Sequence, residues 1–251
     1  MKISNMAVDF VDSMGSDLSV VNAARVSFDK ESEWEYKVVE STDEMDVLET
    51  QGWADVTDWD KDTCMFAQRL SEADQKLIKY LAKHNHWSPF SHTSVSLRIK
   101  APIAVARQLA KHQVGGAWNE VSRRYVDSEP EFYFPDFRKR AANKKQGSTD
   151  ELIDAQKTLG FDVLVENCLE QYQYLLSIGV CPEQARFILP QNTMTEWIWT
   201  GSLYFFSRVC NLRLDPHAQF EVQEVAKLIS DVIRPLYPES WKVLVDDKQK
   251  A

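Results

Sequence analysis

The sequence lacks several signatures that define common classes of protein. Its four cysteines (Cys64, Cys168, Cys181 and Cys210) form no CxxC pair, which argues for reduced thiols and against a disulfide framework or a zinc site. No apolar run approaches the ~20 residues that a membrane helix needs. The first 18 residues carry acids and no apolar segment, so they do not resemble a signal peptide. We therefore expect a cytoplasmic protein, or one in the host cytoplasm if it is viral.

Glycine-rich phosphate motifs are also missing. Among the eight glycines we find neither GxxxxGK[ST] nor GxGxxG, which excludes a P-loop and a Rossmann fingerprint. The net charge of −9 opposes nonspecific binding to duplex nucleic acid. The sequence therefore predicts small molecules or other subunits as partners, and neither nucleic acid nor a membrane.

What the sequence does contain is the pattern of an ordinary globular protein, with 44% hydrophobic and 27% charged residues. The spacing of apolar residues predicts one α+β domain over residues 1–251, with a mixed or antiparallel sheet flanked by helices. Residues 29–62 are acidic, contain tryptophans and lack periodicity, so we interpret them as a surface insertion with one short helix. Residues 138–149 are expected to form a polar loop. Strands are predicted at 2–11, 91–100 and 193–201, and helices at 17–28, 66–84, 102–113, 151–178, 183–188, 202–213 and 215–233.

The most informative segment is RQLAKHQVGGAWNEVSRRY at 107–125. It places Arg107, Lys111, His112, Arg123 and Arg124 in one short window of an acidic chain. Concentrated cations beside amides and a hydroxyl indicate a local anion site, because a coat for nucleic acid would shift the charge of the whole protein.

Two spacings within this segment support that interpretation. On a helix, Gln108, Lys111 and His112 would share one face, although a solvated helix face would show the same pattern. In an extended segment, Glu120, Ser122 and Arg124 would project to one side, and a hydroxyl beside a guanidinium suits a phosphate. An edge strand with polar surface residues is the alternative.

Three further clusters carry candidate chemistry. Glu183 and Arg186 at i, i+3 are either ligands or a surface ion pair of little energy. Arg213 stands upstream of a predicted helix N-terminus and His217 falls in its first turn, where anions are favoured; a simple capping region is the alternative. HNHWSPFSHTS at 84–94 holds three histidines, but without HExxH or thiolates it does not favour a metal.

Taken together, these clusters resemble the flavin-dependent thymidylate synthases, the ThyX family. The family carries Arg-His-Arg followed by Asn-Glu-x-Ser-x-Arg-Tyr, and here Lys111-His112-Gln113 precedes Asn119-Glu120-Val121-Ser122-Arg123-Arg124-Tyr125. Similar blocks follow in the family's order: AARVSF (23–28), HWSPFSH (86–92), APIAVARQ (101–108), FRKRAANKKQGS (137–148), ARFILP (185–190) and NLRLDPHAQFE (211–221).

The resemblance implies a reaction. Such enzymes methylate dUMP to dTMP with 5,10-methylenetetrahydrofolate as the carbon donor and reduced FAD as the hydride source, and NADPH reduces the flavin again. They are homotetramers with active sites at subunit interfaces. They use no enzyme cysteine as nucleophile, and Cys181 is the rival to be examined.

Matched positions also imply the site. Arg213 would lie against the uracil edge and stabilise negative charge on the ring as a catalytic residue. Contacts to dUMP are implied for Gln108, Lys111, Glu120, Val121, Ser122, Arg123, Arg124, Arg186 and Arg213. Contacts to FAD are implied for Ser27, His86, Ser88, Lys111, His112, Gln113, Asn119, Glu120, Ser202, Leu203, Tyr204, Arg208 and His217. No metal is implied.

The chain departs from the family pattern at several of these positions. Lys-His-Gln replaces Arg-His-Arg, the spacer before Ser122 is one residue longer, and Ser202 and Arg208 stand where asparagines are usual. A non-catalytic relative that binds dUMP or dTMP is therefore the alternative function. A nucleic-acid-binding module built on Arg123-Arg124-Tyr125 is a third hypothesis, and the acidic charge opposes it.

Overall fold

A four-stranded antiparallel sheet forms the centre of the molecule. The computed structural model describes residues 1–39, 42–50, 53–55, 65–142, 147–154, 158 and 160–249. The strand order is β2 (Ala7–Met14), β6 (Ser94–Pro102), β11 (Met194–Gly201) and β7 (Gly116–Glu120). The predicted strands at 91–100 and 193–201 are confirmed. The predicted first strand is shifted, since β2 extends to Met14 and β1 (Lys2–Ile3) pairs instead with β8 (Glu131–Phe132).

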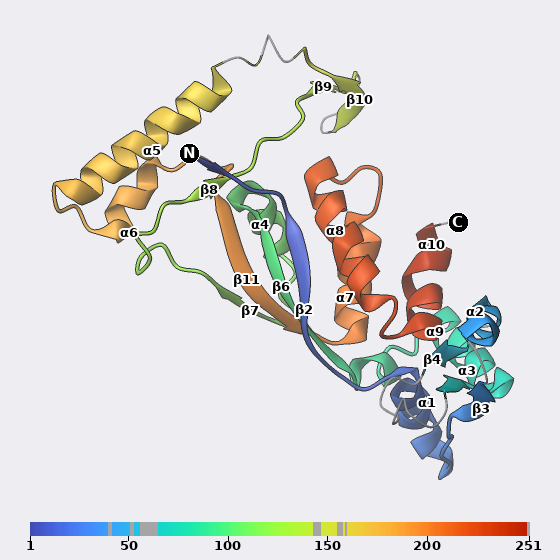
Figure 1. The fold of residues 1–251 in the computed structure, drawn as a ribbon. Coiled ribbons are helices and arrows are strands. Elements are labelled where there is room, and N and C mark those ends of the chain that lie inside the picture. Colours follow the sequence, from blue (N-terminus) through green and yellow to red (C-terminus); the bar gives the residue numbers. More distant parts are fainter. Residues whose placement is uncertain are drawn as a thin grey trace.

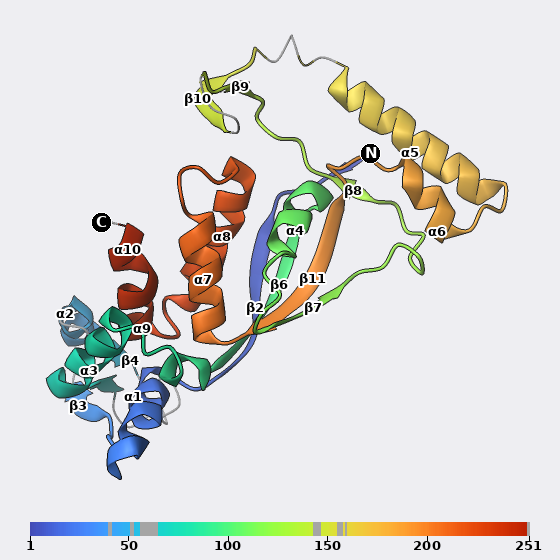
Figure 2. The same ribbon diagram turned by 180° about the vertical axis from the view of Figure 1, so that it is seen from behind.

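Alternation along the central strands explains how the sheet is covered. On β6, Val95, Leu97 and Ile99 are fully buried, and on β11 Trp197 and Trp199 face the same core. Three helices pack on this face: α4 (Ile103–Leu109), α7 (Leu203–Arg213) and α8 (Phe220–Ile233) (Figures 1 and 2). The α+β class with an antiparallel sheet flanked by helices is confirmed.

Further helices lie at the two ends of the sheet (Figure 1). At one end α5 (Phe161–Ser177) packs with α6 (Pro182–Ala185) and η4 (Arg186–Ile188) around a second apolar cluster that includes Phe132 and Leu169. The opposite end holds α1 (Asp17–Arg25), η1 (Val26–Phe28), α3 (Glu72–Lys83), η2 (Pro89–Ser91), α9 (Pro238–Trp241), the π-helical segment η5 (Lys242–Asp246) and α10 (Asp247–Gln249).

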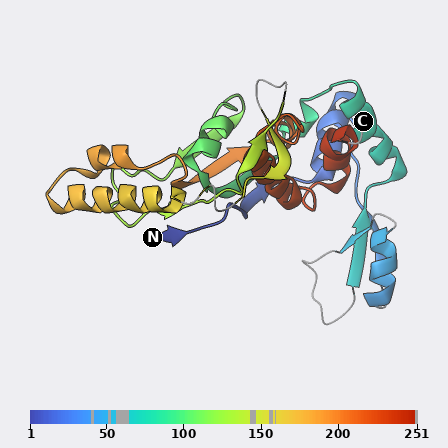
Figure 3. The ribbon, with the colours of Figure 1, turned by 90° about the horizontal axis from the view of Figure 1, so that it is seen from above.

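The segment interpreted as an insertion is more regular than the sequence indicated. It contains the expected helix, α2 (Thr42–Thr50), but also β3 (Glu35–Val39) and β4 (Ala54–Asp55), which pair with β5 (Met65–Arg69). Val39, Met45, Leu48 and Ala67 form a third small core, and this unit projects from the body (Figure 3). Residues 56–64, with Trp59 and Cys64, lie outside the described part of the chain.

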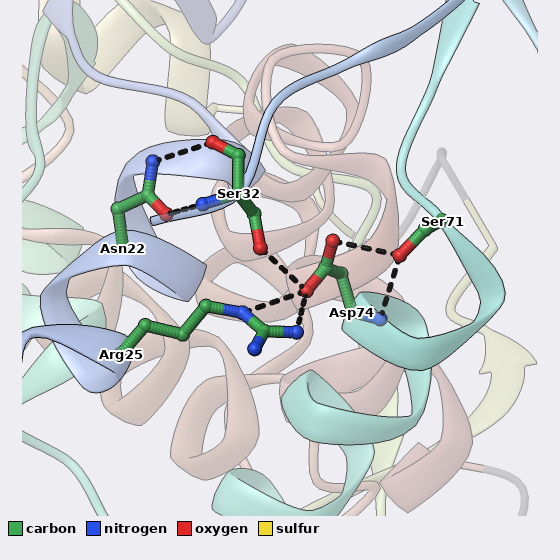
Figure 4. A network of polar contacts seen from close by, with 5 residues as sticks. All are labelled: Asn22, Arg25, Ser32, Ser71 and Asp74. Carbon is green, nitrogen blue, oxygen red and sulfur yellow. Dashed lines mark hydrogen bonds and ion pairs between the residues drawn. The ribbon is translucent and has the colours of Figure 1, made fainter. Parts of the chain in front are cut away.

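A polar network joins the beginning of this segment to two helices (Figure 4). The buried carboxylate of Asp74 on α3 accepts from Arg25 Nε at 3.0 Å, Ser32 Oγ at 2.9 Å and Ser71 Oγ at 2.7 Å. Burial opposes the charge, but these hydrogen bonds prevail and lower the pKa of Asp74. Asn22 exchanges two hydrogen bonds with the Ser32 backbone. The network therefore fixes residues 25–32, which include η1 and Ser27.

Several predicted element boundaries are wrong. Residues 65–69 form strand β5, and α3 begins only at Glu72, after Ser71, whose Oγ accepts from Asp74 N. The predicted helix at 151–178 is α5, which begins at Phe161, and the predicted loop at 138–149 contains β9 (Arg138–Arg140), paired with β10 (Ser148–Leu152).

The C-terminal prediction needs a similar correction. The predicted helix at 215–233 begins at Phe220, because Asp215 Oδ1 accepts from His217 N at 2.7 Å and closes a local turn. Nor is α8 the last helix, since α9, η5 and α10 follow it. The helices predicted at 17–28, 183–188 and 202–213 correspond to α1 with η1, α6 with η4, and α7.

An aromatic side chain packs directly against a pair of glycines on adjacent strands. Gly116 on β7 stands opposite Gly201 on β11. The ring of Phe205 lies over both: a Cβ on Gly116 would come within 2.8 Å of its Cε2, and one on Gly201 within 2.8 Å of its Cγ. Gly115 has φ +89°, a turn conformation that suits glycine. The Gly115-Gly116 pair therefore serves a turn and a close packing contact.

Asp17 gives the fold a pH dependence. Its buried carboxylate accepts from Glu239 N at 2.8 Å and Ser240 N at 3.0 Å, yet burial dominates and raises its pKa from 3.8 to about 6. The folded state therefore binds more protons than the unfolded state between these values. Stability should fall as the pH rises from 4 to 7, and the shift corresponds to about 3 kcal/mol.

Asp17→Asn removes this titration. We expect the unfolding free energy of the wild type, measured relative to Asp17→Asn by urea denaturation, to decline over that pH range by an amount of this order. Asp9→Asn, at an exposed position on β2, serves as the control. A difference between wild type and Asp17→Asn that does not change with pH would contradict the assignment.

Candidate active site

A large cavity of about 990 Å³ lies between α4, the turn before α8 and the β9–β10 hairpin. This cavity, called the larger cavity below, is lined by three of the predicted site residues: Gln108, Arg213 and His217. Sequence reasoning missed other members of its lining, among them Tyr133, Arg138, Phe161, Asn192, Gln219, Phe220 and Glu221. The only sequence signal for them was that Arg138 and the 219–221 segment fall in family-like blocks.

Arg213 is held by two contacts from the α4 segment. Its Nε donates to His112 Nε2 at 3.0 Å, and its Nη2 donates to the carbonyl oxygen of Gln108 at 3.3 Å. Arg213 is the last residue of α7 as predicted, but α8 begins only at Phe220, so the prediction that Arg213 stands just upstream of a helix N-terminus is wrong. The prediction that His217 belongs to the first turn of a helix is likewise wrong. It lies in the turn before α8 with Nδ1 2.9 Å from Asp215 Oδ1.

The electrostatics around Arg213 and His112 favour the binding of an anion. Burial, with Arg213 and Arg208 nearby, lowers the pKa of His112 to about 4, so the imidazole is neutral at pH 7 and can accept a hydrogen bond. Burial also lowers the pKa of Arg213, but a guanidinium remains cationic throughout the physiological range. The cavity therefore presents the fixed positive charge of Arg213, whose guanidinium donates to the neutral imidazole of His112.

Other residues that line the larger cavity are charged and aromatic. Arg138 Nη2 lies 2.6 Å from Glu221 Oε1, and its guanidinium stacks 4.2 Å from the Phe220 ring centroid. Burial opposes ionisation of Glu221, but hydrogen bonds from Gln219 and Arg138 lower its pKa overall. Burial raises the pKa of Tyr133 to about 12, so its hydroxyl stays protonated.

A smaller cavity of about 290 Å³ is lined by part of the NEVSRR segment, but not by Asn119, Ser122 or Arg124. Glu120, Val121, Arg123 and Arg186 line it. Glu120 accepts from Thr195 Oγ1 at 2.6 Å and from Trp118 Nε1 at 3.2 Å. The Glu183–Arg186 pair does not appear as an ion pair here, since Arg186 Nε donates to the Glu183 carbonyl oxygen at 3.2 Å.

The predicted one-sided alternation of Glu120, Ser122 and Arg124 is wrong. Strand β7 ends at Glu120, and residues 122–125 form a turn closed by Tyr125 N donating to the Ser122 carbonyl at 3.0 Å. Arg124 N donates to Ser122 Oγ at 3.3 Å, and its guanidinium donates to the Tyr125 hydroxyl at 2.8 Å. A hydroxyl and a guanidinium still neighbour each other, but in a turn.

The prediction that Gln108, Lys111 and His112 share one helix face is also wrong, because α4 ends at Leu109. His112 N donates to the Leu109 carbonyl, leaving the Gln108 carbonyl to Arg213. Lys111 and Gln113 are exposed beyond the helix. Asn119 pairs with Ile198 and Glu120 with Trp197, so these neighbours project to opposite faces of the sheet.

A third group lies around the N-terminus of α7 and the loop before η2. Trp87 and Tyr204 rings lie 5.9 Å apart, and Arg208 lies over Tyr204 at 6.0 Å. Ser202 caps α7, with its hydroxyl accepting from Phe205 N, while the Leu203 side chain is fully buried and its N–H donates to Thr93 Oγ1. The remaining predicted members, Ser27, His86 and Ser88, are exposed.

Three further findings concern metal binding, a cysteine nucleophile and membrane-spanning helices. Among the residues that the structure describes, no group of three or more His, Cys, Asp or Glu side chains could hold a metal ion. Cys181 is exposed at the N-cap of α6, and it is not among the residues that line the larger or the smaller cavity. None of the helices within the described ranges is long and apolar enough to cross a membrane.

A family model described as thymidylate synthase complementing protein matches residues 9–239. A flavin-dependent thymidylate synthase of Thermosipho africanus is 32% identical over 239 residues, covering 94% of this chain and 89% of the relative. One from Thermus thermophilus is 33% identical over 235 residues, covering 93% of this chain and 73% of the relative.

Solved structures agree with the sequence comparisons. The UMP/dUMP methylase PolB from Streptomyces cacaoi bound with 5-Br dUMP superposes with a TM-score of 0.71 at 28% identity, covering 97% of this chain and 96% of that one. The same protein bound with 5-Br UMP gives the same TM-score. The chain therefore belongs to the thymidylate synthase complementing protein family, the flavin-dependent thymidylate synthases that its motifs resemble.

Proposed function

We propose that this protein is an enzyme that reductively methylates dUMP to dTMP. The observation that carries the proposal is the family match over residues 9–239, which contains every predicted site residue from Ser27 to His217. Relatives named flavin-dependent thymidylate synthase and a UMP/dUMP methylase with the same fold support it. The non-catalytic relative is less favoured, because these similar proteins carry the names of enzymes.

Arg213 is the residue that we assign to stabilising charge on the pyrimidine. It lines the larger cavity beside Gln108, and its two contacts fix the guanidinium before any ligand arrives. A fixed cation stabilises negative charge developing on the ring without reorganising during the reaction. We assign the other contacts with dUMP to the remaining residues of the predicted set: Gln108, Lys111, Glu120, Val121, Ser122, Arg123, Arg124 and Arg186.

The residues around the N-terminus of α7 fit a flavin. The Trp87–Tyr204 pair offers an aromatic surface, Arg208 adds a cation, and His86 and Ser88 are exposed beside them. Ser27, Lys111, His112, Gln113, Asn119, Glu120, Ser202, Leu203 and His217 complete the proposed FAD set. Bound FAD would supply the hydride chemistry, which is the cofactor's own, with NADPH and 5,10-methylenetetrahydrofolate as co-substrates.

We further propose a homotetramer with active sites shared between subunits. In one chain the predicted residues fall into separate groups: those lining the larger cavity, those lining the smaller cavity, and those around Tyr204. A site completed by a neighbouring subunit would bring such groups together. Exposed apolar side chains such as Phe187 and Tyr125, both at least three-quarters exposed, offer surface for such contacts. We place the enzyme in the cytoplasm.

The visible absorption spectrum of the purified protein tests the flavin assignment. After incubation with FAD and removal of free cofactor, we expect the bands of an oxidised flavin, and we expect NADPH to bleach them under anaerobic conditions. A protein that remains colourless with excess FAD would contradict the proposal. Heat-denatured protein treated identically is the control for nonspecific retention.

A further inference from the structure

His112 makes a contact that its proposed place in the FAD site does not explain. Its Nε2 accepts the hydrogen bond from Arg213 Nε at 3.0 Å, so that nitrogen is already occupied in the folded chain. A neutral imidazole has one donor and one acceptor nitrogen, so the proton must lie on Nδ1. We propose that His112 is a positioning residue that fixes the guanidinium of Arg213 toward the larger cavity, and this proposal rests on the proposed function.

The two contacts of Arg213 fix the orientation of its guanidinium and leave some of its donors available to a ligand. A guanidinium has five N–H donors in a rigid plane. The contacts with His112 and with the Gln108 carbonyl involve Nε and Nη2, which lie on the same edge of that plane. Donors outside these two contacts remain for a ligand in the cavity that Arg213 lines. The plane of the group is therefore set by residues that precede it by about a hundred positions in the sequence.

The imidazole is itself held in place. Its ring lies edge-on to Trp199, with centroids 6.4 Å apart, and Trp199 is fully buried among Trp118, Phe205 and Phe206. The groups that bear charge near it are Arg213 and Arg208, both cations, which together with burial keep the ring neutral. A protonated His112 would lose its acceptor and repel Arg213. Packing against Trp199 in the sheet core therefore holds the His112 imidazole in place, and the hydrogen bond to the imidazole holds the Arg213 guanidinium.

Substitution tests the positioning role through separate binding and turnover measurements. His112→Ala should lower kcat/KM for dUMP about 10²-fold, the size expected when a group beside the chemistry is misplaced by about 1 Å. His112→Gln, whose side-chain oxygen can accept from Arg213, should recover most of this loss. Because His112 also belongs to the proposed FAD set, FAD affinity, measured by flavin fluorescence, should fall in His112→Ala, but by a smaller factor than kcat/KM. Loss of FAD affinity in step with turnover, without recovery by glutamine, would overturn the proposal.

A double-mutant cycle separates positioning of Arg213 from an independent role. If His112 acts through Arg213, His112→Ala should have almost no further effect in an Arg213→Ala background. Full additivity of the two losses would overturn the proposal. Urea denaturation of each variant at the assay temperature verifies that the proteins compared are folded.

An NMR measurement tests the contact even if the protein does not turn over dUMP. With ¹⁵N-labelled protein at pH 7, we expect His112 to be neutral with the proton on Nδ1, and the Arg213 Nε–H resonance to shift in His112→Ala. A protonated His112, or an Arg213 resonance unaffected by the substitution, would overturn the positioning role. Failure of turnover with this contact intact would instead count against the proposed function alone.

Discussion

Arg213→Ala is expected to lower kcat/KM for dUMP by about 10²- to 10³-fold, the range found when one preorganised donor to a developing anion is removed. The guanidinium lines the larger cavity and is held by His112 and the Gln108 carbonyl. Arg213→Lys retains a cation, but it loses the planar fork and the Nε donor. We therefore expect lysine to restore only part of the activity. Steady-state kinetics with dUMP varied at saturating FAD, NADPH and 5,10-methylenetetrahydrofolate measure both effects.

A control distinguishes this loss from a general effect of removing positive charge. Arg69 on β5 pairs with Glu35 at 2.9 Å and lies over Trp53, in the small β3–β5–β4 unit. Arg69→Ala should leave kcat/KM within about twofold, because exposed ion pairs contribute little. If Arg213→Ala is as active as Arg69→Ala, the charge-stabilising role of Arg213 is wrong.

Gly201→Ala is expected to destabilise the fold by about 1–3 kcal/mol, the usual cost of forcing extra volume into a packed core. An added Cβ would overlap the Phe205 ring, which packs at 5.3 Å from Trp199 and 5.1 Å from Phe206 and has little room to move. Urea denaturation should show a lower midpoint with an unchanged slope. The Gly116→Ala variant should behave similarly, since Phe205 also covers Gly116.

Replacing Phe205 with a smaller side chain tests whether the Phe205 ring causes the loss of stability in Gly201→Ala. Phe205→Leu alone should be destabilising through a cavity, but combined with Gly201→Ala it should cost less than the sum of the two changes. Strict additivity would show that the glycine is needed for a reason other than the Phe205 contact.

Local sequence patterns were sufficient where an element's own residues decide its structure. Alternating Val95, Leu97 and Ile99 identified β6, and the apolar run after Ser202 identified α7. The signal for the start of α3 was also present, as Ser71 three residues before Asp74, but the apolar spacing of 66–84 obscured it. Strand β5 could not be predicted locally, because it forms by pairing with β3 and β4.

In the candidate active site, too, contacts between residues far apart in the sequence could not be predicted from local patterns. Sequence motifs identified Gln108, His112 and Arg213 individually, but not the hydrogen bonds that join them across a hundred residues. The end of α4 at Leu109 is part of this: the Gln108 carbonyl accepts from Arg213, and His112 N bonds to the Leu109 carbonyl. A tertiary contact therefore accompanies the end of a helix that spacing alone extended to Gln113. Likewise, the helix predicted from residue 215 begins only at Phe220, because Asp215 closes a turn with His217.

Release of tritium from dUMP labelled at C5 tests the central claim most directly. The proton at C5 must leave when carbon is attached there, so tritium in water reports chemistry at the reacting atom. With FAD, NADPH and 5,10-methylenetetrahydrofolate present, we predict tritium release accompanied by an equal amount of dTMP, and no dTMP when either co-substrate is omitted. Binding of dUMP without tritium release under these conditions would contradict the account and identify a non-catalytic relative.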